Sequence, residues 1–205
     1  KIRILGQFVT LAGTGVFDGE KLQGIKELYA ASPKNKGNLR MSDGAIFFEN
    51  TEKGNWKIWK IPEQGHIYSV GVDSATGESD DYSCIQILDI FEQEQVAEYY
   101  GKVDEDTLAV ETMKSGRWYN NSPLIVEVTG GIGRSVQNQV MKLGYYNLYR
   151  RETGYDQFGQ AISDKLGWET KGGRGDGGTK PMLLLDGKRY ISNMGKIRSI
   201  ETIEE

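Results

Sequence analysis

The stretch Pro123–Val128 (PLIVEV) most constrains the fold of this 205-residue chain. It is a short, continuous run of apolar residues, which is typical of a central strand buried on both faces. Such a strand needs neighbouring strands and helices that cover the sheet. The sequence therefore predicts a helix-covered sheet whose central strand carries one acid, Glu127.

A second strand is predicted at Tyr68–Asp73, and it ends in a carboxylate. Small residues follow Asp73, then the acids Asp80 and Asp81, then a second apolar run that begins at Tyr82. A carboxylate at the end of a buried strand is unfavourable unless a positive charge meets it, and a metal ion is one candidate. On this stretch alone, Asp73 is equally compatible with the capping of a turn.

The order of predicted elements places the chain in the α/β class. Short connections between the first three strands predict an antiparallel meander, and the later strands alternate with helices. The predicted strands are Tyr68–Asp73, Ser83–Asp89, Gln95–Lys102, Pro123–Val128 and Tyr145–Tyr149; the predicted helices are Asp104–Tyr119, Ser135–Leu143, Thr179–Leu185 and one beginning within Ile197–Glu205. We expect a polar loop at Arg150–Gly178 and an extended segment at Lys188–Ile191. If the first and fourth strands are neighbours, Asp73 and Glu127 meet at one end of the sheet.

Residues 1–62 do not form a domain of their own in this interpretation. Asp18–Tyr29 has helical spacing, with Asp18 as its N-cap. Ala31–Arg40 is polar and predicts an exposed loop, and two strands, Ala45–Phe48 and Trp56–Ile61, are expected to form a hairpin. We expect this helix and hairpin to pack on the core formed by residues 63–205.

The composition excludes several classes of site. The chain has one cysteine, Cys84, and one histidine, His66, which excludes disulfide scaffolds, His- or Cys-rich zinc sites and, unless His66 itself serves, a Ser-His-Asp triad. We find no apolar run near the ~20 residues that a membrane span needs, no secretory signal and no phosphate-binding GxxxxGK[ST] motif. The single cysteine favours a reducing compartment.

Charge is unevenly distributed along the chain. Residues 63–129 contain 14 acidic and 3 basic side chains, whereas residues 130–198 contain 12 basic and 6 acidic ones. An acidic zone beside basic ones suits a carboxylate metal site next to an anionic substrate, although most of these charges are also compatible with solvated surface.

Two carboxylates that converge on one point supply hard oxygen ligands, which suit Mg²⁺ or Mn²⁺. Two such ions can activate water and stabilise the leaving oxygen in phosphodiester cleavage. The alternative for Glu127 is a buried acid paired with Arg or Lys; we favour the functional interpretation because a lone acid in PLIVEV is otherwise difficult to place.

Several motifs occur in a fixed order along the chain. A strand that ends in Asp is followed by small-x-Gly and by an Asp-Tyr pair, here Asp73, Ala75, Gly77, Asp81 and Tyr82. A strand with Glu is followed by a glycine turn, then by Gly-Trp-x-Thr and Thr-Lys, here Glu127, Gly130, Gly133, Gly167, Trp168, Thr170, Thr179 and Lys180. Together these motifs resemble the nuclease domain of the large terminase subunits of tailed bacteriophages. The leading segment FVTLAGTGVFDGEKL also resembles that family's junction between its ATPase and nuclease domains, so the resemblance covers essentially the whole chain.

The resemblance implies an RNase H-like fold, a mixed sheet flanked by helices, and a Mg²⁺- or Mn²⁺-dependent endonuclease that cuts double-stranded DNA during genome packaging. It assigns Asp73 and Glu127 as metal ligands and Asp81 as a further catalytic acid. The family's third acid follows another helix and has no match here, because Asp176 and Asp186 lie in the wrong context. We therefore expect residues 1–62 to trail an absent ATPase domain, and residues 63–205 to be a nuclease domain truncated at its C-terminus.

Basic residues are the expected DNA contacts. Lys180 belongs to the matched Thr-Lys pair, and Arg150, Arg151 and Arg174 could line the DNA path through sequence-independent phosphate contacts. For Arg174 a flexible, solvated loop is an equally good interpretation.

By the same resemblance, the expected partners are portal protein, the small terminase subunit and an ATPase domain, and the expected location is the cytoplasm of the infected bacterial host.

Two other kinds of RNase H-like enzyme fit less well. An actin-type ATPase lacks its phosphate motifs here, and a resolvase or transposase lacks the Asp-Tyr and Thr-Lys pairs. A non-catalytic module that docks on DNA or the portal is favoured by the missing third acid.

Overall fold

The structure is a computed structural model that describes residues 16–76, 81–151, 158, 165–172 and 179–204. The strands are β1 (Asn35–Ser42), β2 (Ala45–Asn50), β3 (Trp56–Ile58), β4 (Tyr68–Asp73), β5 (Ser83–Asp89), β6 (Glu94–Gly101), β7 (Leu124–Val126), β8 (Arg150–Arg151) and β9 (Lys165–Leu166). The helices are α1 (Gly19–Tyr29), α2 (Glu105–Trp118), α3 (Ile132–Lys142), α4 (Thr179–Ser192) and α5 (Ile200–Glu204).

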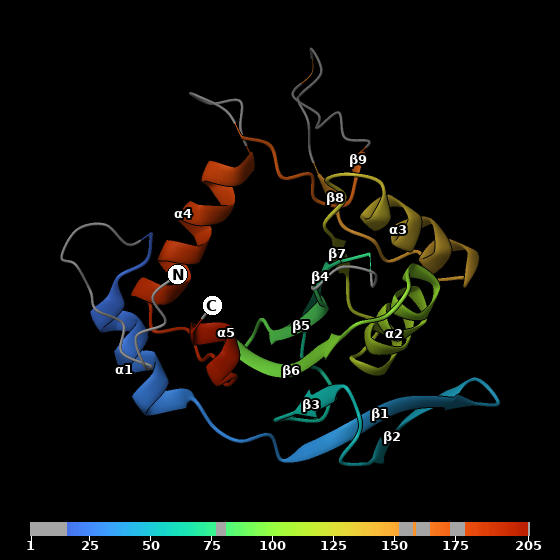
Figure 1. Cartoon of the computed structure of the whole chain (residues 1–205), viewed down its shortest axis with the longest axis horizontal. Helices are drawn as coiled ribbons and strands as arrows, with labels where there is room; N and C mark the ends of the chain where they lie inside the picture. The colour runs from blue at the N-terminus through green and yellow to red at the C-terminus, as the bar shows by residue number, and fades with distance from the viewer. Residues whose placement is uncertain (1–15, 77–80, 152–157, 159–164, 173–178, 205) are drawn as a thin grey trace.

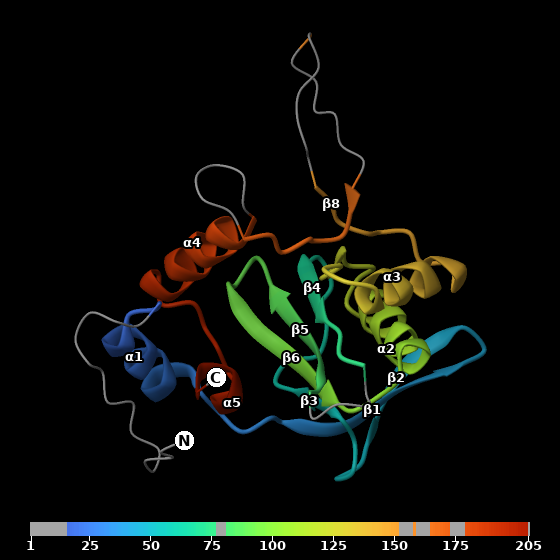
Figure 2. The same cartoon turned by 45° about the horizontal axis from the view of Figure 1, so that its top comes forward.

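Seven strands form one mixed sheet in the order β2-β1-β3-β6-β5-β4-β7, and β8 and β9 form a separate two-stranded ladder. Helices α2 and α3 cover one face of the sheet, while α1, α4 and α5 gather on the opposite side (Figures 1 and 2). The predicted architecture, a mixed sheet flanked by helices, is confirmed. No helix in the described ranges combines the length and apolar character needed to cross a membrane.

The central strands follow the sequence pattern closely. β4, β5 and β6 form the predicted antiparallel meander, and β4 pairs in parallel with β7. The alternation of β-branched and polar residues buries one side chain in two, so that Val70, Val72, Ile85 and Ile87 point into the core beneath α2 and α3. Asp104 caps α2 through the backbone N–H of Thr107, as expected for a helix N-terminus.

A second, smaller apolar cluster holds the other helices together. Ile25 of α1, Ile191 of α4 and Ile203 of α5 form its buried centre. The predicted helix after Asp18 is confirmed, and the Asp18 carboxylate accepts hydrogen bonds from the backbone N–H groups of Glu20 and Lys21.

The prediction of an exposed loop at 31–40 was wrong, because β1 begins at Asn35. This strand is polar because its exposed side faces solvent and only Gly37 and Leu39 are buried. The predicted hairpin was also wrong: β1 separates the two strands, pairing with β2 on one side and β3 on the other. Strand β3 then pairs with β6, which joins this part of the chain to the central sheet.

Two further predictions need correction. Lys188–Ile191 is not extended but lies within α4, where Ile191 is buried against Ile25 and Ile203. Tyr145–Tyr149 is not a full strand but makes one parallel bridge, between Leu148 and Leu124 of β7. The Leu124 N–H donates to the Asn147 carbonyl and the Tyr149 N–H donates to the Leu124 carbonyl, both at 2.9 Å.

Candidate metal centre

The parallel pairing of β4 with β7 brings two carboxylates together. Val72 and Val126 are the last paired residues, and the backbone N–H of Glu127 donates to the Val72 carbonyl at 2.9 Å. Asp73 and Glu127 are the next residues of their strands, so they lie side by side at the carboxyl ends. Their side chains belong to the face opposite the buried Val72 and Val126.

The pKa of Asp73 is affected by its proximity to Glu127. Desolvation raises the pKa of its carboxyl above the ordinary value, and the negative charge of Glu127 raises this pKa further. A hydrogen bond from the Ser74 backbone acts in the opposite direction. A bound cation would relieve the repulsion between the two acids, and an oxygen-only ligand set fits a hard divalent ion.

The backbone around Glu127 is held on both sides. Beyond β7, the Trp168 N–H donates to the Val126 carbonyl at 2.8 Å, and the Val128 N–H donates to the Trp168 carbonyl at 2.7 Å. The Thr129 N–H donates to Glu127 Oε2 at 3.2 Å, which restrains the carboxylate itself. The glycine turn that follows contains Gly130 at φ +86°, a conformation that favours glycine.

Gly133 is required for a different reason, a close approach to Glu127. A Cβ added at Gly133 would lie 1.8 Å from the Glu127 carbonyl oxygen, so α3 can begin against this strand only if position 133 has no side chain. The predicted glycine turn therefore sets the position of the candidate metal centre.

The Gly-Trp-x-Thr and Thr-Lys motifs connect the start of α4 to this centre. The Thr170 N–H donates to Thr129 Oγ1 at 2.7 Å, and the Lys171 N–H donates to Thr179 Oγ1, also at 2.7 Å. The Lys180 N–H donates to the Lys171 carbonyl at 3.1 Å. These positioning roles of Thr129, Thr170 and Thr179 were not predicted, although two of the threonines lie in the recognised motifs.

Asp81 is the third acid that the sequence predicts for the site. It is exposed and lies two residues before β5, in the segment between β4 and β5. Within the described ranges, no group of three or more His, Cys, Asp or Glu side chains could hold a metal ion. The strand pairing brings Asp73 and Glu127 together, and the role of Asp81 stays a prediction.

The predicted DNA-binding residues that the structure describes lie on two elements. Arg150 and Arg151 form β8, opposite Leu166 and Lys165 of β9, and Lys180 is exposed in the first turn of α4. Arg174 lies outside the described residues, as does Asp176. Asp186 is exposed on α4, where it pairs with Arg189 at 3.1 Å.

Sequence comparison finds no relatives: no family model and no curated protein matches the chain. Solved structures do match. The large terminase nuclease of thermophilic phage G20c with bound magnesium aligns with a TM-score of 0.55 and 12% identity, covering 92% of this chain and 75% of that one. The same nuclease with bound zinc gives 0.55 and 10%, with coverages of 91% and 85%. The chain has the fold of large terminase nuclease domains.

A third structure agrees with the first two. The large terminase nuclease domain of Thermus phage P74-26 aligns with a TM-score of 0.52 and 12% identity, covering 87% of this chain and 70% of that one. The RNase H-like fold predicted from the sequence is thereby confirmed. At these identities the likeness concerns the course of the backbone, so the site residues rest on the geometry described above.

Proposed function

We propose that this chain is a divalent-metal-dependent endonuclease that cuts double-stranded DNA during viral genome packaging. The observation that carries the proposal is the juxtaposition of Asp73 and Glu127 at the carboxyl ends of two adjacent parallel strands, in a fold shared with large terminase nucleases.

Asp73 and Glu127 would hold the metal, Mg²⁺ or Mn²⁺, through their carboxylate oxygens. The matching nucleases of phage G20c were crystallised with magnesium and with zinc, which is compatible with an oxygen-rich divalent site. When bound, such an ion lowers the pKa of a water molecule and offsets the negative charge that develops at phosphorus.

The chain's own residues would position the metal-binding carboxylates and bind the DNA. Thr129 fixes one oxygen of the Glu127 carboxylate, and the exposure of Asp73 leaves its carboxylate accessible to a phosphate from solvent. Asp81 is a supporting acid in this proposal. Lys180, Arg150, Arg151 and Arg174 would contact DNA phosphates, which gives binding with low sequence specificity.

The same proposal extends to the neighbouring domain, the partners and the cellular location of the chain. Residues 1–62 would connect the nuclease domain, residues 63–205, to an ATPase domain of a longer terminase subunit. The partners would be double-stranded DNA, portal protein and the small terminase subunit, in the cytoplasm of an infected bacterium.

A second candidate is a non-catalytic module that docks on DNA or on the portal. It is favoured by the arrangement of acids, since the described residues offer a pair of carboxylates rather than a group of three. This module would bind DNA without cutting it.

Plasmid cleavage separates the two candidates. Supercoiled DNA is incubated with the wild-type chain and with Asp73→Asn, in the presence of Mg²⁺ or Mn²⁺. The control is Asp106→Asn, which changes an acid on α2, on the opposite face of the sheet. Nicking by the wild type and the control, with a loss of at least about 100-fold in Asp73→Asn, supports the nuclease. Equal activity in all three proteins, or retention of DNA without nicking, supports rejection of the proposed catalytic site.

A further inference from the structure

A row of side chains continues from the candidate metal centre across the sheet. Asp73 of β4 is opposite Cys84 of β5, and Cys84 is opposite Tyr100 of β6. Directly opposed residues of antiparallel strands project from the same face, so Asp73 and Tyr100 share one face. Two strand spacings separate them, which is about 10 Å.

Tyr100 is the centre of an exposed aromatic group. The rings of Tyr82 and Tyr100 stack with their centroids 4.5 Å apart and their planes within 8° of parallel. The Lys102 ammonium lies 5.2 Å from the centroid of the Tyr82 ring. Both tyrosines are exposed, by 44% and 40%, so this stack is a preformed aromatic surface at the rim of the sheet.

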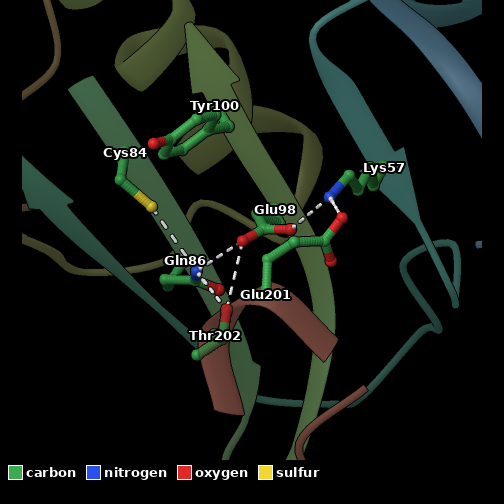
Figure 3. Close-up of a pocket in the computed structure, with 7 residues that line it drawn as sticks. All are labelled: Lys57, Cys84, Gln86, Glu98, Tyr100, Glu201 and Thr202. Atoms are coloured by element: carbon green, nitrogen blue, oxygen red, sulfur yellow. Dashed lines mark hydrogen bonds and ion pairs between the residues drawn. The ribbon is translucent and has the colours of Figure 1, made fainter. Parts of the chain in front are cut away.

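A pocket of about 240 Å³ opens beside this surface (Figure 3). Its lining comes from β3, β5, β6 and α5, namely Lys57, Cys84, Gln86, Glu98, Tyr100, Glu201 and Thr202. Tyr82 covers one face of the Tyr100 ring, and Tyr100 contributes part of its remaining surface to the pocket. The volume lies below the 300–1,000 Å³ or so that is usual for larger small-molecule ligands, so the pocket suits one ring system rather than a whole nucleotide.

The charge of the pocket excludes a phosphate as its occupant. Glu98 and Glu201 supply two carboxylates, and the single ammonium, Lys57, already bonds to both at 3.2 and 2.9 Å. Figure 3 shows these groups converging with Gln86 and Thr202 on the wall away from Tyr100. Glu98 already accepts from Gln86, Ser199 and Thr202 within this wall. The Glu201 carboxylate, whose side chain is 66% exposed, can accept further hydrogen bonds from ring N–H or amino groups, as a nucleobase offers.

We propose that this pocket binds one unpaired nucleobase, stacked on Tyr100, of the DNA strand that reaches Asp73 and Glu127. The proposal rests on the proposed function, because it takes nucleic acid as the ligand. Paired bases hide their faces inside the duplex, so the pocket selects a frayed end, a gap or a separated strand. Stacking of a base on an aromatic side chain is tolerant of sequence, which suits cleavage without a strict site.

The test is a binding titration without divalent metal, so that no strand is cut. Fluorescence anisotropy compares a labelled single-stranded 12-mer with an abasic 12-mer of the same length. We expect the wild type to bind the base-containing strand about tenfold more tightly. Tyr100→Leu and Tyr100→Ala should remove this difference, whereas Tyr100→Phe, which keeps the ring, should retain it.

Tyr146→Ala is the matched control, because Tyr146 is 75% exposed and lies in the segment after α3. The inference is overturned if the wild type binds both strands equally, if it binds neither, or if Tyr100→Leu behaves like Tyr146→Ala. The base-versus-abasic comparison in the wild type does not depend on the folding of any variant.

The two proposals can fail separately. Asp73→Asn should keep its base-dependent binding, because the assay contains no metal, while it loses plasmid nicking. Base-dependent binding without nicking in the wild type would reject the nuclease and leave the base pocket in place. Nicking without base-dependent binding would reject the pocket alone.

Discussion

Single residues set the chemistry of this chain, and Asp73 and Glu127 are the clearest case. Each acid alone is compatible with turn capping or with an ion pair. Their parallel pairing changes that interpretation, because it sets the two carboxylates beside each other. Desolvation raises the pKa of Asp73, and the negative charge of Glu127 raises it further. Two acids kept together in this way are typical of a cation site.

Gly133 offers a test of how finely this site is positioned. Gly133→Ala should shift the Glu127 carbonyl, since the new Cβ would otherwise lie 1.8 Å from it. We expect a destabilisation of about 1–3 kcal/mol from overpacking and a loss of nicking of about 100-fold. Gly131→Ala is the control, because a Cβ there has no neighbour within 4 Å, and it should change stability and nicking activity only slightly. Thermal melting and plasmid nicking measure the two effects, and equal behaviour of the variants would contradict the argument.

His66 predicts a dependence of stability on pH. Its Nδ1 lies 2.7 Å from Oδ2 of the buried Asp89, and this hydrogen bond raises the pKa of His66 above 6.5, its ordinary value. A raised folded-state pKa means that the stabilisation is fully present below about pH 6.5 and is lost as pH rises through the folded-state value. Urea midpoints measured from about pH 6 to about pH 8 should fall in the wild type. His66→Gln should flatten that slope, and an unchanged slope would exclude His66 as its source.

At the scale of elements, the sequence predicted what depends on local pattern. The meander of β4, β5 and β6 follows from short connections and alternating side chains, and the capped helices follow from Asp18 and Asp104. The meeting of Asp73 with Glu127 was predicted only as a condition on strand order, which the β4–β7 pairing fulfils.

Long-range pairing explains what the sequence did not predict. β1 is polar, and its place between β2 and β3 depends on partners rather than on its own residues. The Tyr82–Tyr100 stack likewise depends on the register of β5 against β6, which decides which residues lie opposite each other. The sequence of either strand alone does not reveal that register.

One ion-pair cluster joins the C-terminal segment to the sheet. Glu94 is 1% exposed, and it accepts from Arg198 Nη2 at 2.6 Å and pairs with Lys60 at 2.7 Å. Arg198 also donates to the Tyr29 carbonyl at 3.0 Å, so it links β6 to the end of α1. Although burial acts to raise the pKa of Glu94, hydrogen bonds from Lys60 and Arg198 hold that pKa below its ordinary value.

Removal of this link should loosen the layer of α1, α4 and α5. We expect Arg198→Met to lower the free energy of unfolding by about 2–3 kcal/mol, less than for a fully buried pair because Arg198 is partly exposed. Arg189→Met, which breaks only the exposed pair with Asp186, should cost less than about 0.5 kcal/mol. Chemical denaturation compares the two variants, and similar losses would show that the Glu94 cluster has no special role.

At the scale of the whole molecule, the distribution of charge agrees with the proposed binding of metal and DNA. The acidic residues of 63–129 include the carboxylates of the candidate metal centre, while the basic residues of 130–198 include those of β8 and the start of α4. Hydrogen bonds through Thr129, Thr170 and Thr179 tie the beginning of α4 to the edge of that centre. Lys180 is therefore attached to the same structural unit as Glu127.

A phosphate contact by Lys180 predicts a change in the salt dependence of DNA binding. Lys180→Ala should weaken binding to duplex DNA regardless of sequence and reduce the slope of log K against log salt by about 1. Lys53→Ala, an exposed lysine in the turn before β3, should leave the slope unchanged. Filter binding over a range of salt concentrations gives both slopes, and equal slopes would remove Lys180 from the DNA path.

Crystals soaked with Mn²⁺ test most directly whether Asp73 and Glu127 form a divalent-metal site. We predict an anomalous difference peak at the manganese absorption edge within bonding distance of carboxylate oxygens from both residues, about 2.0–2.2 Å. The peak should disappear in Asp73→Asn. Full occupancy of Mn²⁺ elsewhere, with no peak between these two carboxylates, would contradict the account.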